Sequence, residues 1–299
     1  MKRIALFILT NLAVMLVLSI AYHVVCAVIG PEALAELSRG GIDFGFLAVW
    51  ALVFGMGGAV ISLLMSKSMA KWATHATVID GSEGPSERWL VETVRQLSER
   101  AGVKMPEVAI YPGEANAFAT GAFKNSALVA VSTGIMEQMT RDELRAVLGH
   151  EMSHVANGDM VTLTLVQGVL NACVLFLARV IGYVADGALG GERGRRRGGG
   201  GTFLLVYYLM QFILGLGAAL VVNAYSRKRE YAADRGSAEL LVSAGPMIAA
   251  LRRLGNLQPG VLPDSLKAMG ISGRHASLLA THPSLEDRIA ALEKLQLGL

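Results

Sequence analysis

Long uncharged stretches alternate with polar segments along this chain. Four of these stretches are long enough to cross the roughly 30 Å hydrocarbon core of a bilayer as a helix. They run from Ile4 to Ile29, from Phe44 to Met65, from Val161 to Ala185 and from Thr202 to Ala224. The pattern predicts four transmembrane helices arranged as two hairpins. The third run alone carries a charge, Arg179, which either marks function or faces other helices or the membrane surface.

The polar segments carry the periodicities of a folded domain. Apolar residues at helical spacing predict a helix over residues 87–100 and a C-terminal amphipathic helix over 284–297. Short β-prone pieces separated by turn residues predict a small sheet from residues 107–111, 116–120 and 127–131. The hairpins therefore interrupt the folded domain. The expected parts are an N-terminal hairpin over 1–70, a first domain segment over 71–160, a second hairpin over 161–224 and a second domain segment over 225–299.

The composition agrees with membrane insertion. Of the 299 residues, 53% are apolar and 17% charged, which is too apolar for an ordinary soluble domain. The net charge of +3 is modest and no basic stripe with interleaved aromatic residues occurs, so nucleic acid is not an expected partner. Cys26 and Cys173 both lie in apolar runs, and they predict no disulfide.

The charges beside the apolar runs predict an orientation. Lys2 and Arg3 precede the first run, and Lys67 and Lys71 follow the second, which places these ends in the cytoplasm. The loop before the fourth run is also rich in arginine, in conflict with two full crossings by the second hairpin. That hairpin either crosses twice against its loop charges or does not cross fully. We expect crossing, with the folded domain on the cytoplasmic side.

One helix in the first domain segment carries the pattern of a metal site. Thr140 and Glu143 form a capping box that predicts where this helix begins. His150 and His154, four residues apart, lie on one face of it, so two imidazoles can hold a single metal ion with Glu151 beside it. This is the geometry of a zinc hydrolase. The alternative is a pair of hydrogen-bonded histidines on a half-buried helix.

A catalytic zinc ion usually takes three protein ligands and one water. The fully local solution is absent, because the third histidine would fall at Met160. Glu230 stands out because Asp234 follows it on the same helical face and can orient a ligand histidine through its ring N–H. These acids could instead pair with neighbouring basic residues. Spacing leaves three other candidates for the third ligand, which are Asp159, His275 and His282.

The predicted strand before the metal helix is a candidate for substrate binding. An exposed edge strand beside the zinc can add a substrate backbone as a further strand. The residues concerned are Asn116, Ala117, Phe118, Ala119 and Thr120. The strand could equally be structural only.

Three motifs in this order resemble the HtpX family of bacterial heat-shock membrane proteases. They are His-Glu-Met-Ser-His at 150–154, Ser-Arg-Lys-Arg-Glu-Tyr-Ala-Ala-Asp at 226–234 and Thr-His-Pro-Ser-Leu-Glu-Asp-Arg-Ile at 281–289. The likeness covers essentially the whole chain, and it also includes Asn-Ala-Phe-Ala-Thr-Gly at 116–121. More distantly, the pattern is similar to the membrane proteases that cleave prenylated proteins.

The resemblance implies a fold, a cofactor and residue roles. The fold is an α-rich integral membrane protein with a mainly α, zincin-like (gluzincin) catalytic domain and a small β-sheet, in the cell inner membrane. One Zn²⁺ per chain would be held by His150, His154 and Glu230. Glu151 would act as general base and Asp234 would support the ligands, while His282 and Arg288 would line the cleft and stabilise the oxyanion or support the site.

The expected activity is cleavage of unfolded or membrane proteins. Two competing interpretations remain open at this point. One is a membrane chaperone that uses zinc for stability and does not cut, although Glu151 has no purpose in a purely structural site. The other is a processing protease of narrow specificity.

Overall fold

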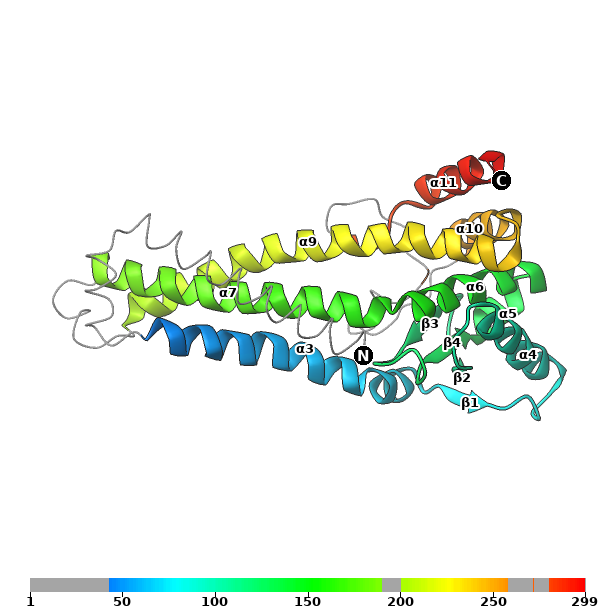
Figure 1. Ribbon diagram of the computed structural model, residues 1–299, viewed down its shortest axis with the longest axis horizontal. Coiled ribbons are helices and arrows are strands. Elements are labelled where there is room, and N and C mark those ends of the chain that lie inside the picture. The colour runs from blue at the N-terminus through cyan, green and yellow to red at the C-terminus, as the bar shows by residue number, and fades with distance from the viewer. Residues whose placement is uncertain (1–42, 190–199, 258–270, 272–279, 299) are drawn as a thin grey trace. The chain divides into compact units, whose positions relative to one another are not determined.

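The computed structural model describes residues 43–189, 200–257, 271 and 280–298 (Figure 1). The chain divides into two compact units. One contains Met1–Ile61 and Thr164–Val221, and the other contains Ser62–Leu163 and Val222–Leu299. The four domain segments expected from the sequence stay a prediction.

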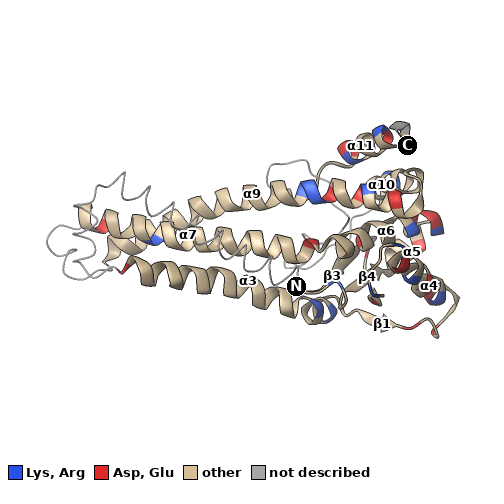
Figure 2. Cartoon of the chain, viewed as in Figure 1, with Lys and Arg blue, Asp and Glu red and all other residues tan. Residues whose placement is uncertain are grey.

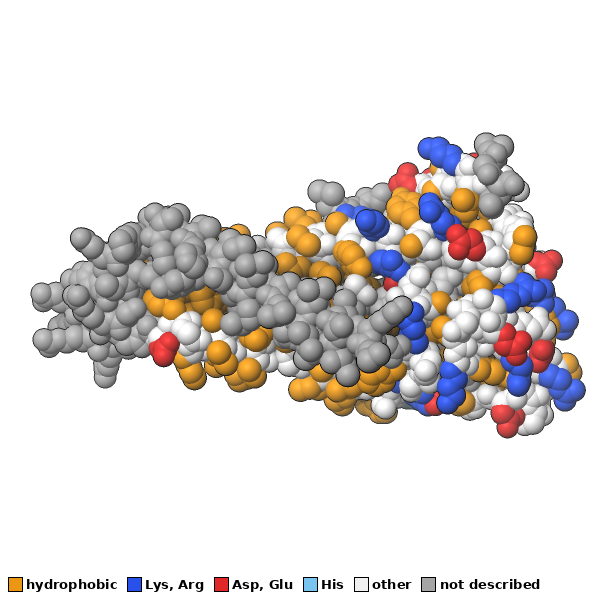
Figure 3. Space-filling model, in the orientation of Figure 1, with side chains coloured by type: hydrophobic (Ala, Val, Ile, Leu, Met, Phe, Trp, Pro, Cys, Tyr) orange, Lys and Arg blue, Asp and Glu red, His pale blue; other side chains and the backbone are white. Residues whose placement is uncertain are grey.

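In the described part of the chain, three long apolar helices supply candidate membrane spans. They are α3 (Phe44–Thr74), α7 (Asp159–Leu189) and α9 (Gly201–Leu241). Most of their length is free of charge (Figure 2), and hydrophobic side chains cover much of their visible surface (Figure 3). Phe54 and Phe212 are 60% and 71% exposed, which suits contact with lipid. The first predicted run, Ile4 to Ile29, lies outside the described residues, so the number of spans stays a prediction.

Arg179 packs between helices of the first unit. Its guanidinium lies 4.2 Å from the ring centroid of Trp50 and 5.7 Å from that of Tyr207. Both separations suit cation–π contacts, which offset part of the cost of placing a charge in an apolar helix. The geometry therefore matches an arginine that faces other helices.

Among the described residues, a four-stranded sheet belongs to the second unit. Its strands are β1 (Thr77–Ile79), β2 (Glu107–Tyr111), β3 (Ala117–Thr120) and β4 (Leu128–Ser132), in the order β1-β2-β4-β3. β2 and β4 pair in parallel and the other neighbours are antiparallel. The three strands predicted from the sequence are present to within a residue. β1 has only three residues, too few to show a periodic pattern.

Helices pack on this sheet and on one another. They are α4 (Pro85–Arg100), α5 (Thr133–Gln138), α6 (Arg141–Asn157), α10 (Gly245–Asn256) and α11 (Leu285–Gly298). α6 is central, because it contacts α4, α10 and β3 and is buried from Leu144 to Val155 except for Arg145. The capping box of Thr140 and Glu143 begins it as predicted. Gly158 ends it in the left-handed conformation, with φ 72°, that favours glycine.

Candidate metal centre

Small residues bring α6 and α9 into close contact. A Cβ atom added at Gly236 would lie 2.4 Å from Oγ and 2.8 Å from Cβ of Ser153. One residue further along α9, Ser237 donates a hydrogen bond of 2.7 Å to the carbonyl of Ala146. These contacts fix the two helices at a separation that larger side chains would not allow. The preceding turns of α9 therefore face the histidines of α6.

Three donor side chains converge between these helices. The Nε2 atoms of His150 and His154 are 3.1 Å apart. Oε2 of Glu230 lies 3.5 Å from Nε2 of His150, and Oε1 lies 3.3 Å from Nε2 of His154. All three residues are buried. In a tetrahedral zinc site with bonds of about 2.0–2.1 Å, neighbouring ligand atoms are about 3.3 Å apart. The three observed separations are close to this distance.

The outer nitrogens of both imidazoles are bonded to carboxylates. Nδ1 of His150 lies 2.9 Å from Oδ1 of Asp234, and Nδ1 of His154 lies 2.7 Å from Oδ2 of Asp159. When each Nδ1 donates to its carboxylate, each Nε2 presents a lone pair to the centre of the site. Two lone pairs at 3.1 Å repel unless a cation lies between them. The donor set therefore fits a metal ion.

The charges around the centre also favour a cation. Burial alone would lower the pKa of His154, but Asp159 and Glu230 outweigh it and raise the pKa to about 10. Burial would raise the pKa of Glu230, whereas His282 and Arg288 hold it well below its usual value. Glu230 is thus an anion, and the imidazoles bind positive charge strongly. A metal ion supplies that charge by displacing a proton.

Arg288 connects two of the carboxylates. Its Nε and Nη2 atoms donate to the two oxygens of Asp234 at 2.8 and 2.6 Å, and Nη1 lies 3.3 Å from Glu230. The side chain is fully buried. Such a two-pronged pair fixes the orientation of Asp234 as well as neutralising it. Arg288 therefore supports the ligands and has no exposure to a substrate in this structure.

Glu151 differs from every other acid in the cluster. Its two oxygens are buried, and they form no hydrogen bond that meets standard geometry with the described part of the chain. Burial raises the pKa of its carboxyl, and the nearby imidazoles of His150 and His154 oppose this rise. A carboxylate without a fixed partner, with a raised pKa and beside a metal site, suits proton transfer.

His282 reaches the centre from the segment before α11. Its Nε2 lies 3.8 Å from Oε1 of Glu230, and its Nδ1 lies 2.8 Å from Oγ1 of Thr281. Burial lowers the pKa of His282 and so favours its neutral form, whereas the charge of Glu230 opposes this shift. A neutral ring here can donate one hydrogen bond toward the centre.

The structure describes two of the three other candidates for the third ligand, Asp159 and His282. Asp159 contacts the outer nitrogen of His154 and an arginine, Arg229, and it does not point at the three donors. His275 lies outside the described residues. His282 is near Glu230 but further from it than either imidazole of α6 is.

The candidate substrate strand β3 lies at the edge of the sheet, as expected, and contacts α6. All four of its residues are buried, although an exposed edge was expected. Asn116 directly precedes the strand and has a role that the sequence did not suggest. Its Oδ1 accepts hydrogen bonds from the amides of Ala117 and Ile271 at 2.9 and 3.1 Å. Asn116 is therefore a structural cap of the strand.

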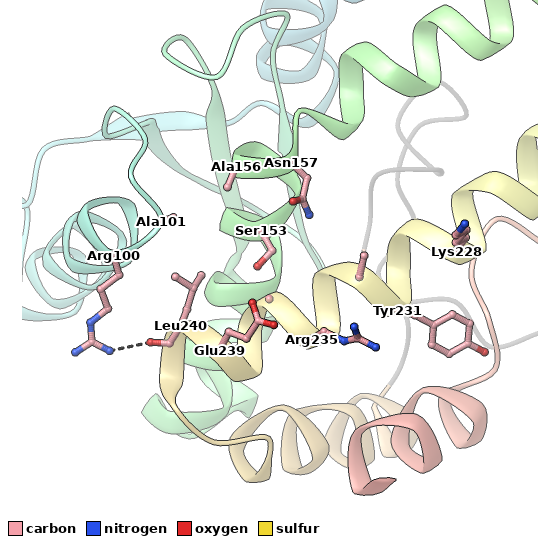
Figure 4. Close-up of a pocket in the computed structure, with 12 residues that line it drawn as sticks. Arg100, Ala101, Ser153, Ala156, Asn157, Lys228, Tyr231, Arg235, Glu239 and Leu240 are labelled. Carbon is pink, nitrogen blue, oxygen red and sulfur yellow. Dashed lines mark hydrogen bonds between the residues drawn. The ribbon is translucent and has the colours of Figure 1, made fainter. Parts of the chain in front are cut away.

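A separate pocket of about 640 Å³ lies along another face of α6 (Figure 4). Ser153 and Asn157 of α6, the end of α4 and one side of α9 line it. None of the three donor residues and neither Glu151 nor His282 is part of its lining. The pocket is thus distinct from the metal centre.

Comparison with known proteins agrees with this geometry. Peptidase family M48 matches residues 85–296. A protein named Protease HtpX homolog from Verminephrobacter eiseniae is 54% identical over 293 residues, covering 98% of each chain. A protein of the same name from Leptothrix cholodnii is 53% identical over 297 residues, covering 98% of this chain and 99% of the relative.

The fold also has a solved counterpart. The crystal structure of S. mikatae Ste24p matches with a TM-score of 0.59 and 17% sequence identity, over 91% of this chain and 64% of that one. At this identity the likeness concerns the fold alone. The family match extends over most of the chain and includes both helices of the metal centre and His282. The chain belongs to peptidase family M48.

Proposed function

We propose that this chain is a membrane-bound, zinc-dependent endopeptidase that cleaves misfolded or damaged membrane proteins. The observation that carries the proposal is the combination of three converging donors with an unpaired, buried Glu151. A structural zinc site closes all four positions with protein ligands, whereas three ligands leave one position for water. The three donors, together with Glu151, therefore support a catalytic zinc site better than a purely structural one.

His150, His154 and Glu230 would hold the zinc ion. When bound, zinc supplies a Lewis acid that polarises the peptide carbonyl and lowers the pKa of a water molecule to around 7. Glu151 accepts the proton of the attacking water and then delivers it to the leaving amine. Asp234 and Asp159 keep both imidazoles oriented, and Arg288 keeps Asp234 in place.

Two further groups complete the proposed site. His282 donates its ring N–H toward the carbonyl oxygen as negative charge develops on it. β3 provides the edge along which the substrate backbone extends, with Ala117, Phe118, Ala119 and Thr120 as the contact residues and Asn116 as their cap. Recognition through the backbone tolerates many sequences, which suits a quality-control protease. Because β3 is buried, substrate entry requires the edge to be uncovered.

The proposed location is the inner membrane, with several spans and the catalytic unit in the cytoplasm. Lys67 and Lys71, which follow the apolar part of α3, favour this orientation. Both lysines pair with Glu107 of β2, at 2.7 and 2.5 Å, so they belong to the second unit.

The test compares the wild type with Glu151→Gln in detergent, with and without added zinc. We expect zinc-dependent cleavage of an unfolded protein by the wild type, and loss of cleavage with full zinc content in the variant. The matched control is Glu137→Gln, which changes an exposed glutamate of α5 and should leave cleavage intact. Cleavage that survives in Glu151→Gln would remove this residue from the role of base.

Substrate range needs a second measurement. Unfolded soluble proteins, membrane proteins and prenylated peptides should be offered side by side. We expect the unfolded and membrane proteins to be cut. Cleavage of one peptide class alone would indicate a processing protease, and zinc binding without any cleavage would indicate a chaperone.

A further inference from the structure

We propose that the pocket of Figure 4, lined by α6, α9 and the end of α4, binds a phosphate-bearing anion. This chemistry is shared by phospholipid headgroups and small organic phosphates. The pocket lies within the second unit and contains no residue of the proposed catalytic set (Figure 4). The site therefore adds to the proposed function and does not depend on it.

Three consecutive basic residues, 227–229, follow the apolar part of α9. Arg227 donates a hydrogen bond of 2.8 Å to the carbonyl of Ala280, and Arg229 pairs with Asp159. Lys228, between them, lines the pocket instead (Figure 4). Among the residues that the structure describes, none forms an ion pair or hydrogen bond with its ammonium group. Its charge is available to a ligand.

Two basic side chains are aligned along this face of α9. Arg235 follows Lys228 by seven residues, or two helical turns, so both cations lie on the same stripe as Tyr231. The guanidinium of Arg235 likewise has no ion-pair partner in the described part of the chain. A lysine and an arginine whose charges are unpaired line one pocket with a phenol between them, and all three can donate to phosphate oxygens.

Basic side chains outnumber acidic ones in the lining of the pocket. Arg100, Lys228 and Arg235 face a single acid, Glu239, so the pocket favours an anion. The remaining surface includes Ala101, Ala156, Ala232 and Leu240, which suit the apolar part of a larger ligand. Arg100 already donates to the carbonyl of Leu240 at 2.9 Å, and this bond holds that end of the pocket together.

Two sources can supply such an anion. A phospholipid is present around any chain that spans a bilayer, and Lys228 follows the apolar run of α9 by only four residues. A soluble organic phosphate offers the same charge without the acyl chains. A phospholipid site needs acyl chains for tight binding, whereas a site for a soluble phosphate does not. Binding assays with and without acyl chains can therefore separate the two sources.

The experiment uses the full chain in a neutral detergent. The probes are short-chain phosphatidylglycerol, short-chain phosphatidylcholine and glycerol phosphate, and the measurements are thermal unfolding and direct binding. We expect phosphatidylglycerol to bind and to raise the unfolding temperature, and phosphatidylcholine to bind more weakly. The double variant Lys228→Gln with Arg235→Gln should lose roughly 30-fold in affinity, because each basic residue contributes about fivefold near an anionic surface.

The control is the double variant Arg88→Gln with Lys104→Gln. It has the same change in net charge, and both residues are exposed and outside the pocket. We expect it to bind like the wild type, and zinc content should be equal in all proteins as a check on folding. If glycerol phosphate binds the wild type as tightly as phosphatidylglycerol does, the proposed anion site is supported and its ligand is a soluble phosphate. The proposal fails if neither anion binds the wild type, or if the control loses as much affinity as the pocket variant.

Discussion

Oδ2 of Asp159 lies 2.7 Å from Nδ1 of His154, on the side of the ring that faces away from the three donors. Gly158 makes this possible, because it ends α6 and turns the chain so that the next residue reaches back to the helix. Asp159 is 1% exposed and also pairs with Arg229 of α9. One carboxylate thus joins the metal helix to the helix that carries Glu230.

Replacing Asp159 by Asn should weaken zinc binding by roughly 10- to 100-fold, because the carboxylate orients His154 and raises its basicity. Asn keeps the size of the side chain but not its charge. The affinity is measured by competition with a coloured chelator. Asp142→Asn is the control, since it removes an exposed acid from the first turn of the same helix. An unchanged affinity in Asp159→Asn would show that the hydrogen bond has no influence on the metal.

Arg288→Met should lower the free energy of unfolding by about 3–5 kcal/mol, because it leaves buried carboxylates without their partner. Arg288→Lys should recover only part of this loss, since lysine cannot form the two-pronged contact with Asp234. Denaturant unfolding of the detergent-solubilised chain gives both values. Arg252→Met is the control, because its pair with Glu293 is exposed and should contribute at most about 1 kcal/mol. Full recovery by lysine would mean that charge alone matters at this position.

Gly236→Ala should reduce zinc affinity without touching a ligand. The new Cβ would meet Ser153 at 2.4 Å from Oγ and 2.8 Å from Cβ, so α6 and α9 must move apart and the donors with them. Rotation of the hydroxyl could relieve the first contact but not the second. Adding Ser153→Gly should restore the affinity, a coupling that a double-mutant cycle measures. Gly217→Ala, on the same helix but with open space around it, should have no effect.

Local periodicity explains which parts of the site could be predicted from the sequence. The spacing of His150 and His154 fixes their common face as soon as the segment is helical, and Thr140 marks where the helix begins. Asp234, in contrast, bonds to His150 across 84 residues of sequence. That contact depends on how closely α9 packs on α6, and no helical period contains this information. Glu230 could therefore be favoured over its rivals only by its partner acid and by family resemblance.

The remaining differences also have physical reasons. Asp159 was a candidate ligand because its residue type suits a metal, but the turn at Gly158 directs it to the outer nitrogen of His154. β1 is too short to give an alternating pattern. The cap formed by Asn116 joins β3 to Ile271, far away in the sequence. The residue type of Asn116 is compatible with this role, because asparagine side chains often accept hydrogen bonds from nearby backbone amides at the ends of strands and helices.

Val242 offers a test of backbone strain at the end of α9. Its φ is 56°, a left-handed conformation that is a genuine outlier for a β-branched residue. The amides of Val242 and Ser243 bond to the carbonyls of Glu239 and Ala238 at 3.2 and 2.9 Å, as in a helix end that favours glycine. The side chain is 87% exposed, so little packing is lost when it is removed.

Val242→Gly should therefore stabilise the protein by roughly 1 kcal/mol. The left-handed conformation costs about 1–2 kcal/mol for a residue with a Cβ, and the greater freedom of glycine in the unfolded chain offsets part of the gain. Denaturant unfolding in detergent measures the difference. Val242→Ala is the matched control, because it removes the branch but keeps the Cβ, and it should gain less than glycine. If alanine stabilised as much as glycine, the cost would come from the exposed branched side chain and not from the backbone conformation.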